Sequence, residues 1–257
     1  MTDLRDVPFS VVPGFRPLAL DVLSPEGAGP HPVVVFVHGG GWRVGDRRTF
    51  VPTFPAAQGF DLIRAAGFAV VSIDYRLTGE AVFPAQLDDV RAALAWVRAH
   101  GPEHGLDATR MVLWGESAGG HLAALAGLDR QRGVRGVVDW YGPSDLIAFP
   151  APGPDDERPT REESLVGGPI PEHTDLARAA SPARRAHAEA PPFHIAHGDA
   201  DDLVPPAQSE ALHEALRVQG VESTLTLVPG AGHMWRGVAD PATVMDPALA
   251  FARRVTA

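Results

Sequence analysis

Short runs of apolar residues alternate along this chain with longer stretches in which apolar residues recur at helical spacing. Val33–Val37 is apolar at every position, so it fits a strand that is buried on both faces of a sheet. In Leu87–Val97 the apolar residues instead have the spacing of a helix with one buried face. Strands that alternate with helices are typical of a parallel sheet covered by helices. The sequence therefore predicts an α/β fold with a mostly parallel, twisted sheet and helices on both faces.

The same reasoning gives approximate bounds for the other elements. We expect strands at Leu18–Leu23, Val33–Val37, Ala69–Ile73, Met111–Trp114, Val137–Trp140, Phe193–Ala196 and Thr224–Val228. We expect helices at about Pro52–Ala66, Leu87–Val97, Ala118–Leu128, Ala207–Val218 and Val244–Val255. The chain contains no internal repeat and no interdomain linker, which predicts one domain over residues 1–257.

The segment from Asp145 to about Pro192 differs from the rest of the chain. It is rich in proline, glycine and charge, and its only regular patterns are short helical patches near Thr160–Leu165 and Thr174–Ala180. It is too long for an ordinary loop. We interpret residues 145–192 as a small cap or lid-like insertion over the carboxyl edge of the sheet, where open α/β folds bind ligands. A surface excursion without a role is the alternative.

Composition excludes several kinds of chemistry. The chain has no cysteine, lysine or asparagine, so Cys nucleophiles, Fe–S clusters, Schiff bases, Ser–Lys dyads and P-loop lysines are ruled out. The formal net charge of -10 gives no support for binding nucleic acid or anionic membranes. No apolar run approaches the ~18 residues of a membrane span, and the first residues lack the apolar core of a signal peptide. We therefore expect a cytoplasmic protein; the sequence does not indicate its oligomeric state.

A five-residue motif, Gly115-Glu116-Ser117-Ala118-Gly119, carries the strongest chemical signal. It follows a short apolar run and precedes a stretch of small residues, which predicts a strand, a sharp turn and a helix. That context makes a G-x-S-x-G sequence a nucleophile elbow, with the serine hydroxyl exposed at the turn. Ser117 is therefore the predicted nucleophile, and a glycine-rich surface turn is the alternative.

A serine hydroxyl also needs donors that stabilise the negative charge that develops on the attacked carbonyl oxygen. The segment His38–Trp42 places three consecutive glycines directly after a buried strand, so its backbone N–H groups can approach a ligand closely. Gly40, Gly41 and Ala118, the residue after the nucleophile, are the predicted oxyanion-hole donors. We expect His38 to hold this loop by hydrogen bonding.

A serine nucleophile requires a base and an acid that orients it. His233 lies on the glycine-rich loop after the last predicted strand, and it follows both Ser117 and a cluster of aspartates. The order Ser, Asp, His is that of an α/β-hydrolase triad, which makes His233 the predicted base. Four carboxylates compete for the role of the acid, and their positions choose among them only weakly: Asp145, Asp199, Asp201 and Asp202.

Together these motifs resemble the α/β-hydrolase superfamily, and within it the small carboxylesterase and feruloyl-esterase-like group that neighbours the hormone-sensitive-lipase-like esterases. The resemblance rests on His38–Trp42, Asp74–Leu77, Phe83–Gln86, Gly115–Gly120, Ser181–Phe193, His197–Pro205 and Pro229–His233. It implies an α/β-hydrolase fold. In the family pattern H-G-x-x-D-x-x-V-P the fixed aspartate falls on Asp201. The resemblance thus implies a triad of Ser117, His233 and Asp201.

The expected activity is hydrolysis of small carboxylic esters through an acyl-Ser117 intermediate, without a metal or other cofactor. An amide-cleaving enzyme of the same fold, an arylformamidase or a small peptidase, is the nearest alternative. Such formamidases tend to have a tyrosine where Gly41 stands, which argues against them. A binding protein of this fold that has lost catalysis is the third possibility, and the filled triad positions disfavour it.

Overall fold

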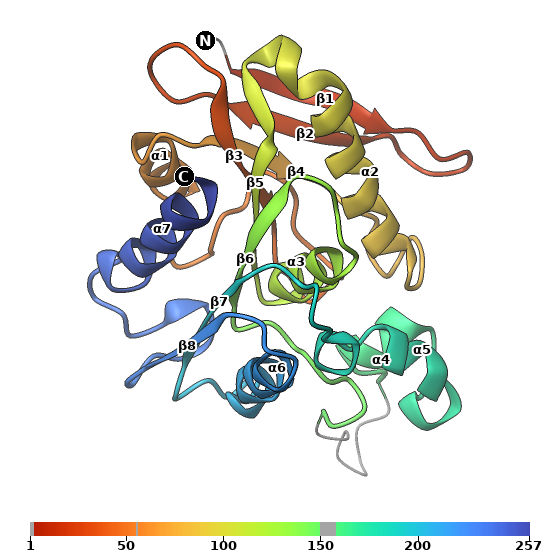
Figure 1. Ribbon diagram of the computed structural model, residues 1–257. Coiled ribbons are helices and arrows are strands. Elements are labelled where there is room, and N and C mark those ends of the chain that lie inside the picture. Colours follow the sequence, from red (N-terminus) through yellow and green to blue (C-terminus); the bar gives the residue numbers. More distant parts are fainter. Residues whose placement is uncertain (1–2, 55, 150–157) are drawn as a thin grey trace.

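In the computed structural model, which describes residues 3–54, 56–149 and 158–257, eight strands form one sheet in the order β1-β2-β4-β3-β5-β6-β7-β8 (Figure 1). The strands are β1 (Leu4–Ser10), β2 (Leu18–Leu23), β3 (His31–Val37), β4 (Ala69–Ile73), β5 (Leu106–Glu116), β6 (Val134–Trp140), β7 (Phe193–Gly198) and β8 (Ser223–Val228). The α-helices are α1 (Ala56–Ala65), α2 (Ala85–His100), α3 (Ala118–Leu128), α4 (Arg161–Val166), α5 (Thr174–Ala179), α6 (Ala207–Val218) and α7 (Ala242–Thr256). Short 3₁₀ turns lie at Gly101–His104, Ile170–Glu172, Pro182–Arg185 and His233–Trp235.

The sheet is mixed but mostly parallel. β1 pairs with β2 and β2 with β4 in antiparallel fashion, whereas every pairing from β4 through β3, β5, β6 and β7 to β8 is parallel. The carboxyl ends of the parallel strands therefore meet at one edge, where loops from distant parts of the sequence come together. The predicted fold class, an α/β-hydrolase fold, is confirmed.

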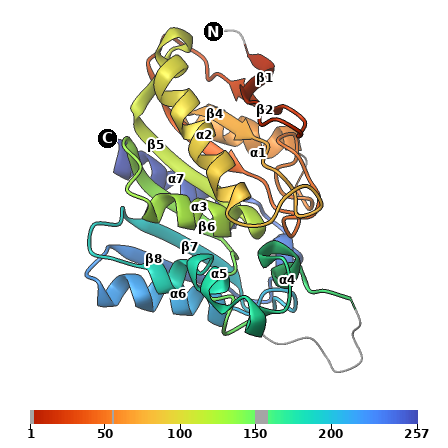
Figure 2. The ribbon, with the colours of Figure 1, turned by 90° about the vertical axis from the view of Figure 1, so that its right-hand side faces the viewer.

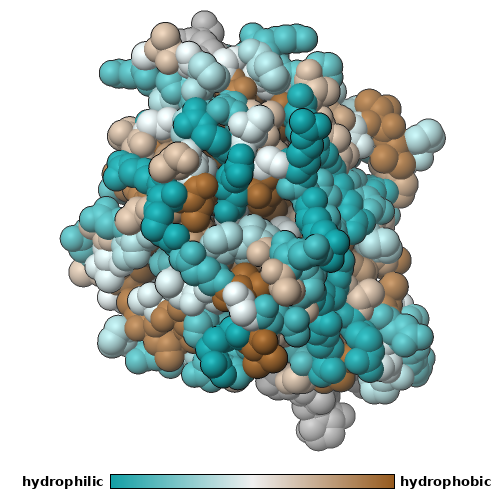
Figure 3. Space-filling view, viewed as in Figure 1, coloured by the Kyte–Doolittle hydropathy of each residue, from teal (hydrophilic) through white to brown (hydrophobic). Residues whose placement is uncertain are grey.

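Helices cover both faces of the sheet. α1 and α7 lie on one side, and α2, α3 and α6 lie on the other (Figures 1 and 2). Strand β3 contributes alternate residues to the two cores: Val35 packs beneath α2 and α3, and Phe36 packs beneath α1. Both side chains are fully buried, which explains why the sequence of this strand is a continuous apolar run. At the surface, hydrophobic side chains are scattered among hydrophilic ones (Figure 3).

The elements differ from the sequence-based expectations mainly at their ends. All seven expected strands and all five expected helices are present, and α3 and α6 have the expected bounds. Strand β1 was missed because it is an edge strand without a fully buried residue, and Arg5 and Asp6 interrupt its apolar pattern. Strand β5 begins five residues earlier than Met111, in a half-buried stretch that contains charged side chains.

The connection between β6 and β7 carries α4 and α5, close to the two helical patches expected there. Helix α4 starts at a capping box, in which the Thr160 hydroxyl accepts from the Glu163 N–H and the Glu163 carboxylate accepts from the Thr160 N–H. It ends at Gly167, which has a left-handed conformation. Figures 1 and 2 place both helices on the side of the sheet covered by α3 and α6. A single domain with a cap insertion at 145–192 stays a prediction.

Among the described residues, no helix is long and apolar enough to cross a membrane.

Candidate active site

Ser117 lies at the sharp turn between β5 and α3. Its backbone has a positive φ of 52° with ψ of −121°, a conformation that residues with a side chain rarely adopt. The glycines on either side make the turn possible: a β-carbon on Gly115 would clash with the carbonyl of Gly119, and one on Gly119 would clash with the carbonyl of Val37. The Ser117 N–H donates to the carbonyl of Trp140 on β6, which fixes the turn to the sheet. The serine is thus held at the carboxyl edge of the sheet.

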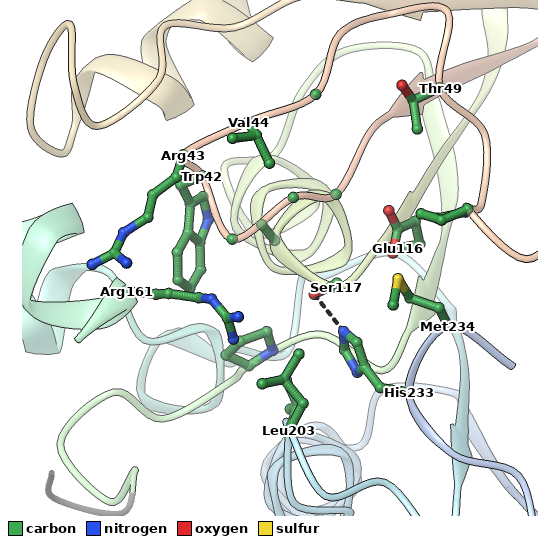
Figure 4. Close-up of a pocket in the computed structure, with 18 of the residues that line it drawn as sticks. Trp42, Arg43, Val44, Thr49, Glu116, Ser117, Arg161, Leu203, His233 and Met234 are labelled. Carbon is green, nitrogen blue, oxygen red and sulfur yellow. Dashed lines mark hydrogen bonds between the residues drawn. The ribbon is translucent and has the colours of Figure 1, made fainter. Parts of the chain in front are cut away.

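The structure brings Ser117, His233 and Asp201 together. The Ser117 hydroxyl lies 3.0 Å from His233 Nε2, and the dashed line in Figure 4 marks this hydrogen bond. The other ring nitrogen, Nδ1, lies 2.7 Å from Asp201 Oδ2. With its proton on Nδ1, the imidazole donates to the carboxylate and accepts from the hydroxyl, which is the arrangement of a serine, a base and an orienting acid. The ring of Tyr141 packs edge-on against His233 and limits its motion.

Asp201 is held as an ionised acceptor. Burial opposes its ionisation, but hydrogen bonds from His197, His233 and the Val204 backbone outweigh that effect and lower its pKa well below the usual range. Its Oδ1 accepts from the N–H groups of Leu203 and Val204, each at 2.9 Å. Its Oδ2 faces His233 and, at 3.3 Å, the Nε2 of His197. Sequence reasoning assigned no role to His197, although it begins the motif that contains Asp201.

The three other candidate carboxylates lie elsewhere. Asp199 accepts from the N–H of Gly230 and braces the loop that precedes His233. Asp202 is exposed. Asp145 pairs with Arg184, at 2.8 Å. Among the described residues, none of these three is hydrogen-bonded to His233. The geometry therefore favours Asp201, which the family resemblance also implies.

The predicted oxyanion loop, His38–Trp42, follows β3 and lies beside the serine. Gly40, Gly41 and Ala118, the predicted donors, line the same cavity as Ser117. Gly40 and Gly41 both have positive φ, of 108° and 59°, which explains why this loop needs glycine. Ala118 is the first residue of α3, where backbone N–H groups have no partner within the helix. Backbone donors from two elements can thus converge on one oxygen.

Buried histidines support this loop. His38 Nδ1 lies 2.7 Å from the carbonyl of Gly39, and its ring stacks on Tyr75, whose hydroxyl donates to the His38 carbonyl. On its other flank, Trp42 Nε1 donates to His121 Nδ1 at 3.2 Å. Burial lowers the pKa of both histidines to about 4, so both are neutral at pH 7. They therefore hold the loop and the first turns of α3 as uncharged hydrogen-bonding groups.

The cavity in front of Ser117 has a volume of about 440 Å³. Sequence reasoning did not identify several residues that line it: Thr49, Glu116, Pro143, Arg161, Glu162, Leu203 and Met234. Val44 and Leu203 form exposed apolar parts of its wall. In the part of the chain that the structure describes, no group of three or more histidine, aspartate or glutamate side chains could hold a metal ion.

Glu116, immediately before the serine, is fully buried. Burial raises its pKa to about 7, against the opposing effect of the Gly39 N–H. A β-carbon on Gly39 would clash with its carboxyl group, so this acid packs directly under the oxyanion loop. The position of Glu116 within the elbow motif is the one sequence signal that could have drawn attention to it.

These features define a member of the α/β-hydrolase class. A carbohydrate esterase from gut microbiota, solved in truncated form, matches with a TM-score of 0.86 and 27% identity over 100% of this chain and 96% of that chain. A bacterial heroin esterase matches with a TM-score of 0.77 and 26% identity over 100% of this chain and 84% of that chain. The chain belongs to the BD-FAE family, whose sequence profile matches residues 20–216. The family likeness predicted from the motifs is confirmed.

Curated relatives include esterases of Mycobacterium tuberculosis. Esterase LipC is 35% identical over 221 residues, an alignment that covers 79% of this chain and 53% of LipC. The chain spans about half the length of the curated relatives that it matches, such as LipC.

Proposed function

We propose that the protein is a serine esterase that hydrolyses carboxylic esters with a small acyl group through an acyl-Ser117 intermediate. The observation that carries the proposal is the continuous hydrogen-bonded series from the Ser117 hydroxyl through His233 to Asp201. Membership of the BD-FAE family supports it, and so do the names of relatives such as esterase LipC.

The first half-reaction transfers the acyl group to the enzyme. Ser117 Oγ attacks the ester carbonyl carbon while His233 Nε2 accepts the hydroxyl proton, and Asp201 stabilises the resulting imidazolium. The carbonyl oxygen becomes an oxyanion that accepts from the N–H groups of Gly40, Gly41 and Ala118. The tetrahedral intermediate then collapses, the bond to the alcohol oxygen breaks, and His233 donates its proton to the leaving alcohol.

The second half-reaction reverses these roles with water as the nucleophile. His233 accepts a proton from water as the water oxygen attacks the acyl carbon, and it returns that proton to Ser117 Oγ as the acid leaves. The cavity of about 440 Å³ is in the range of small-molecule sites and favours short substrates. The apolar side chains of Val44 and Leu203 supply surface for an uncharged part of the substrate.

Ser117→Ala tests the proposal. We expect kcat on p-nitrophenyl acetate to fall by at least about 10,000-fold, since the nucleophile is lost. The melting temperature and circular dichroism spectrum should match those of the wild type. Measuring kcat/KM on a p-nitrophenyl ester and the matched anilide separates ester from amide preference. Wild-type turnover by the alanine variant would contradict the assignment of the nucleophile, and a preference for the anilide would favour an amidase.

A further inference from the structure

Two arginines line the cavity that contains Ser117, and they have different surroundings. Arg43 points away from the serine toward α4 (Figure 4). Its Nη2 donates to the carbonyls of Pro159 and Thr160 and to the Ser164 hydroxyl, at 2.7 to 2.8 Å. Arg43 is therefore engaged in holding the β6–β7 connection against the oxyanion loop.

Arg161, the first residue of α4, extends from the β6–β7 connection into the cavity, toward the side that holds Ser117 and Leu203 (Figure 4). Within the described residues its guanidinium makes no hydrogen bond or ion pair. Its side chain passes directly over the oxyanion loop: a β-carbon on Gly41 would lie 2.6 Å from Arg161 Cδ. A residue larger than glycine at position 41 would displace the arginine, so the loop and the arginine are matched in shape.

The acidic side chains around the cavity offset the positive charge of Arg161 only in part. Glu116 and Glu162 both line the cavity, and burial is the largest influence on the pKa of each carboxyl group. It raises the pKa of Glu162 although the nearby Arg161 and Arg43 act to lower it. It raises the pKa of Glu116 to about 7. Burial thus shifts both carboxyl groups toward the uncharged form, whereas a guanidinium keeps its charge throughout the physiological range.

We propose that Arg161 is a specificity-determining residue that binds a carboxylate group carried by the ester substrate. The proposal rests on the esterase activity proposed above and narrows its substrate class to esters that carry a second, anionic carboxylate. A guanidinium presents a planar pair of donors that matches the two oxygens of a carboxylate. Its place above Gly41 puts that contact beside the scissile carbonyl, on the acyl or the alcohol side.

Two pairs of substrates test the proposal, and in each pair the carboxylate of one ester is replaced by a neutral amide of similar size in the other. The alcohol-side pair is 4-acetoxybenzoate and 4-acetoxybenzamide; the acyl-side pair is phenyl hydrogen adipate and its neutral monoamide. The quantity measured is the ratio of kcat/KM for the anionic ester to kcat/KM for the neutral one. A ratio removes general losses of activity, because these affect both members of a pair.

In Arg161→Gln we expect this ratio to fall by about fivefold in at least one pair, the upper range for a solvent-accessible ion pair. Arg161→Lys should retain much of the preference. Arg178→Gln is the matched control, because Arg178 is an exposed arginine on α5 outside the cavity. It should leave both ratios unchanged. Raising the salt concentration to about 1 M should reduce the wild-type preference by screening.

The possible outcomes separate this proposal from the proposed function. If Arg161→Gln leaves both ratios unchanged in an active enzyme, the carboxylate proposal is wrong and the esterase assignment stands. Equal losses on the anionic and neutral esters would assign Arg161 to the support of the oxyanion loop and also overturn the proposal. A wild-type protein that hydrolyses neither member of either pair would contradict the esterase assignment and this proposal together.

Discussion

At the scale of single residues, the serine turn concentrates several unfavourable features in a small volume. Ser117 has a positive φ, which costs on the order of 1–3 kcal/mol for a residue with a side chain. Glu116 beside it is buried without a cationic partner among the described residues. The rest of the fold must compensate for both. Active sites commonly combine strain and desolvation in this way, because the same features position a reactive group.

Glu116 should make the protein less stable as pH rises. Its folded pKa of about 7 lies above the ordinary value of 4.5, so its contribution is fully present below pH 4.5 and is lost as pH rises through 7. Glu116→Gln removes this dependence. We therefore expect the variant to gain stability relative to the wild type between pH 4.5 and 8, by up to about 3 kcal/mol. Urea denaturation across this pH range measures the difference.

Glu103→Gln is the control for this experiment, since Glu103 is exposed. Its stability should follow that of the wild type at every pH. A constant difference between Glu116→Gln and the wild type from pH 4.5 to 8 would contradict this prediction, because it would mean that folding does not raise the pKa of Glu116.

At the scale of elements, the oxyanion loop and helix α4 are joined by one side chain. Arg43 follows the loop glycines, and its guanidinium contacts the residues that begin α4. The capping box of Thr160 and Glu163 fixes the start of the same helix. The position of Arg161 in the cavity therefore depends on contacts between two segments that lie more than 100 residues apart in the chain.

Arg43→Ala should loosen α4 without unfolding the protein. We expect faster amide hydrogen exchange at residues 159–166, and a decrease of about two- to fivefold in kcat/KM on a neutral ester, as for other exposed charged contacts. Arg217→Ala removes an exposed arginine paired with Glu214 on α6 and should change neither quantity. Unchanged exchange at 159–166 in Arg43→Ala would mean that other contacts hold this helix.

At the scale of the whole molecule, the parts that could be predicted from sequence follow short-range rules. Apolar periodicity located seven of the eight described strands and the helices that cover the sheet, because burial of one or both faces produces that periodicity. The order of Ser117, a cluster of aspartates and His233, each on a loop after a parallel strand, indicated residues that the sheet topology brings to one edge. Within the cluster, only the family resemblance implied Asp201. Strand β1 could not be predicted, because Arg5 and Asp6 interrupt its apolar pattern, whereas the other edge strand, β8, keeps alternating apolar residues.

Contacts between segments that lie far apart in the chain could not be predicted from the sequence. Arg47 is buried and forms ion pairs with Asp21 and Asp74, which come from different parts of the chain. Nothing local distinguishes these residues from solvated charges. The same holds for Arg161, whose place in the cavity depends on how the β6–β7 connection packs. The reaction type could therefore be proposed from the sequence, whereas a substrate contact such as the one proposed for Arg161 could not.

The most direct test of the central assignment is covalent labelling of the intact protein with a fluorophosphonate, followed by mass spectrometry. The wild type should gain one adduct, and peptide mapping should place it on Ser117. Ser117→Ala should gain none, and His233→Ala should react much more slowly because the serine loses its base. Absence of labelling in the wild type, or an adduct on another residue, would contradict the account.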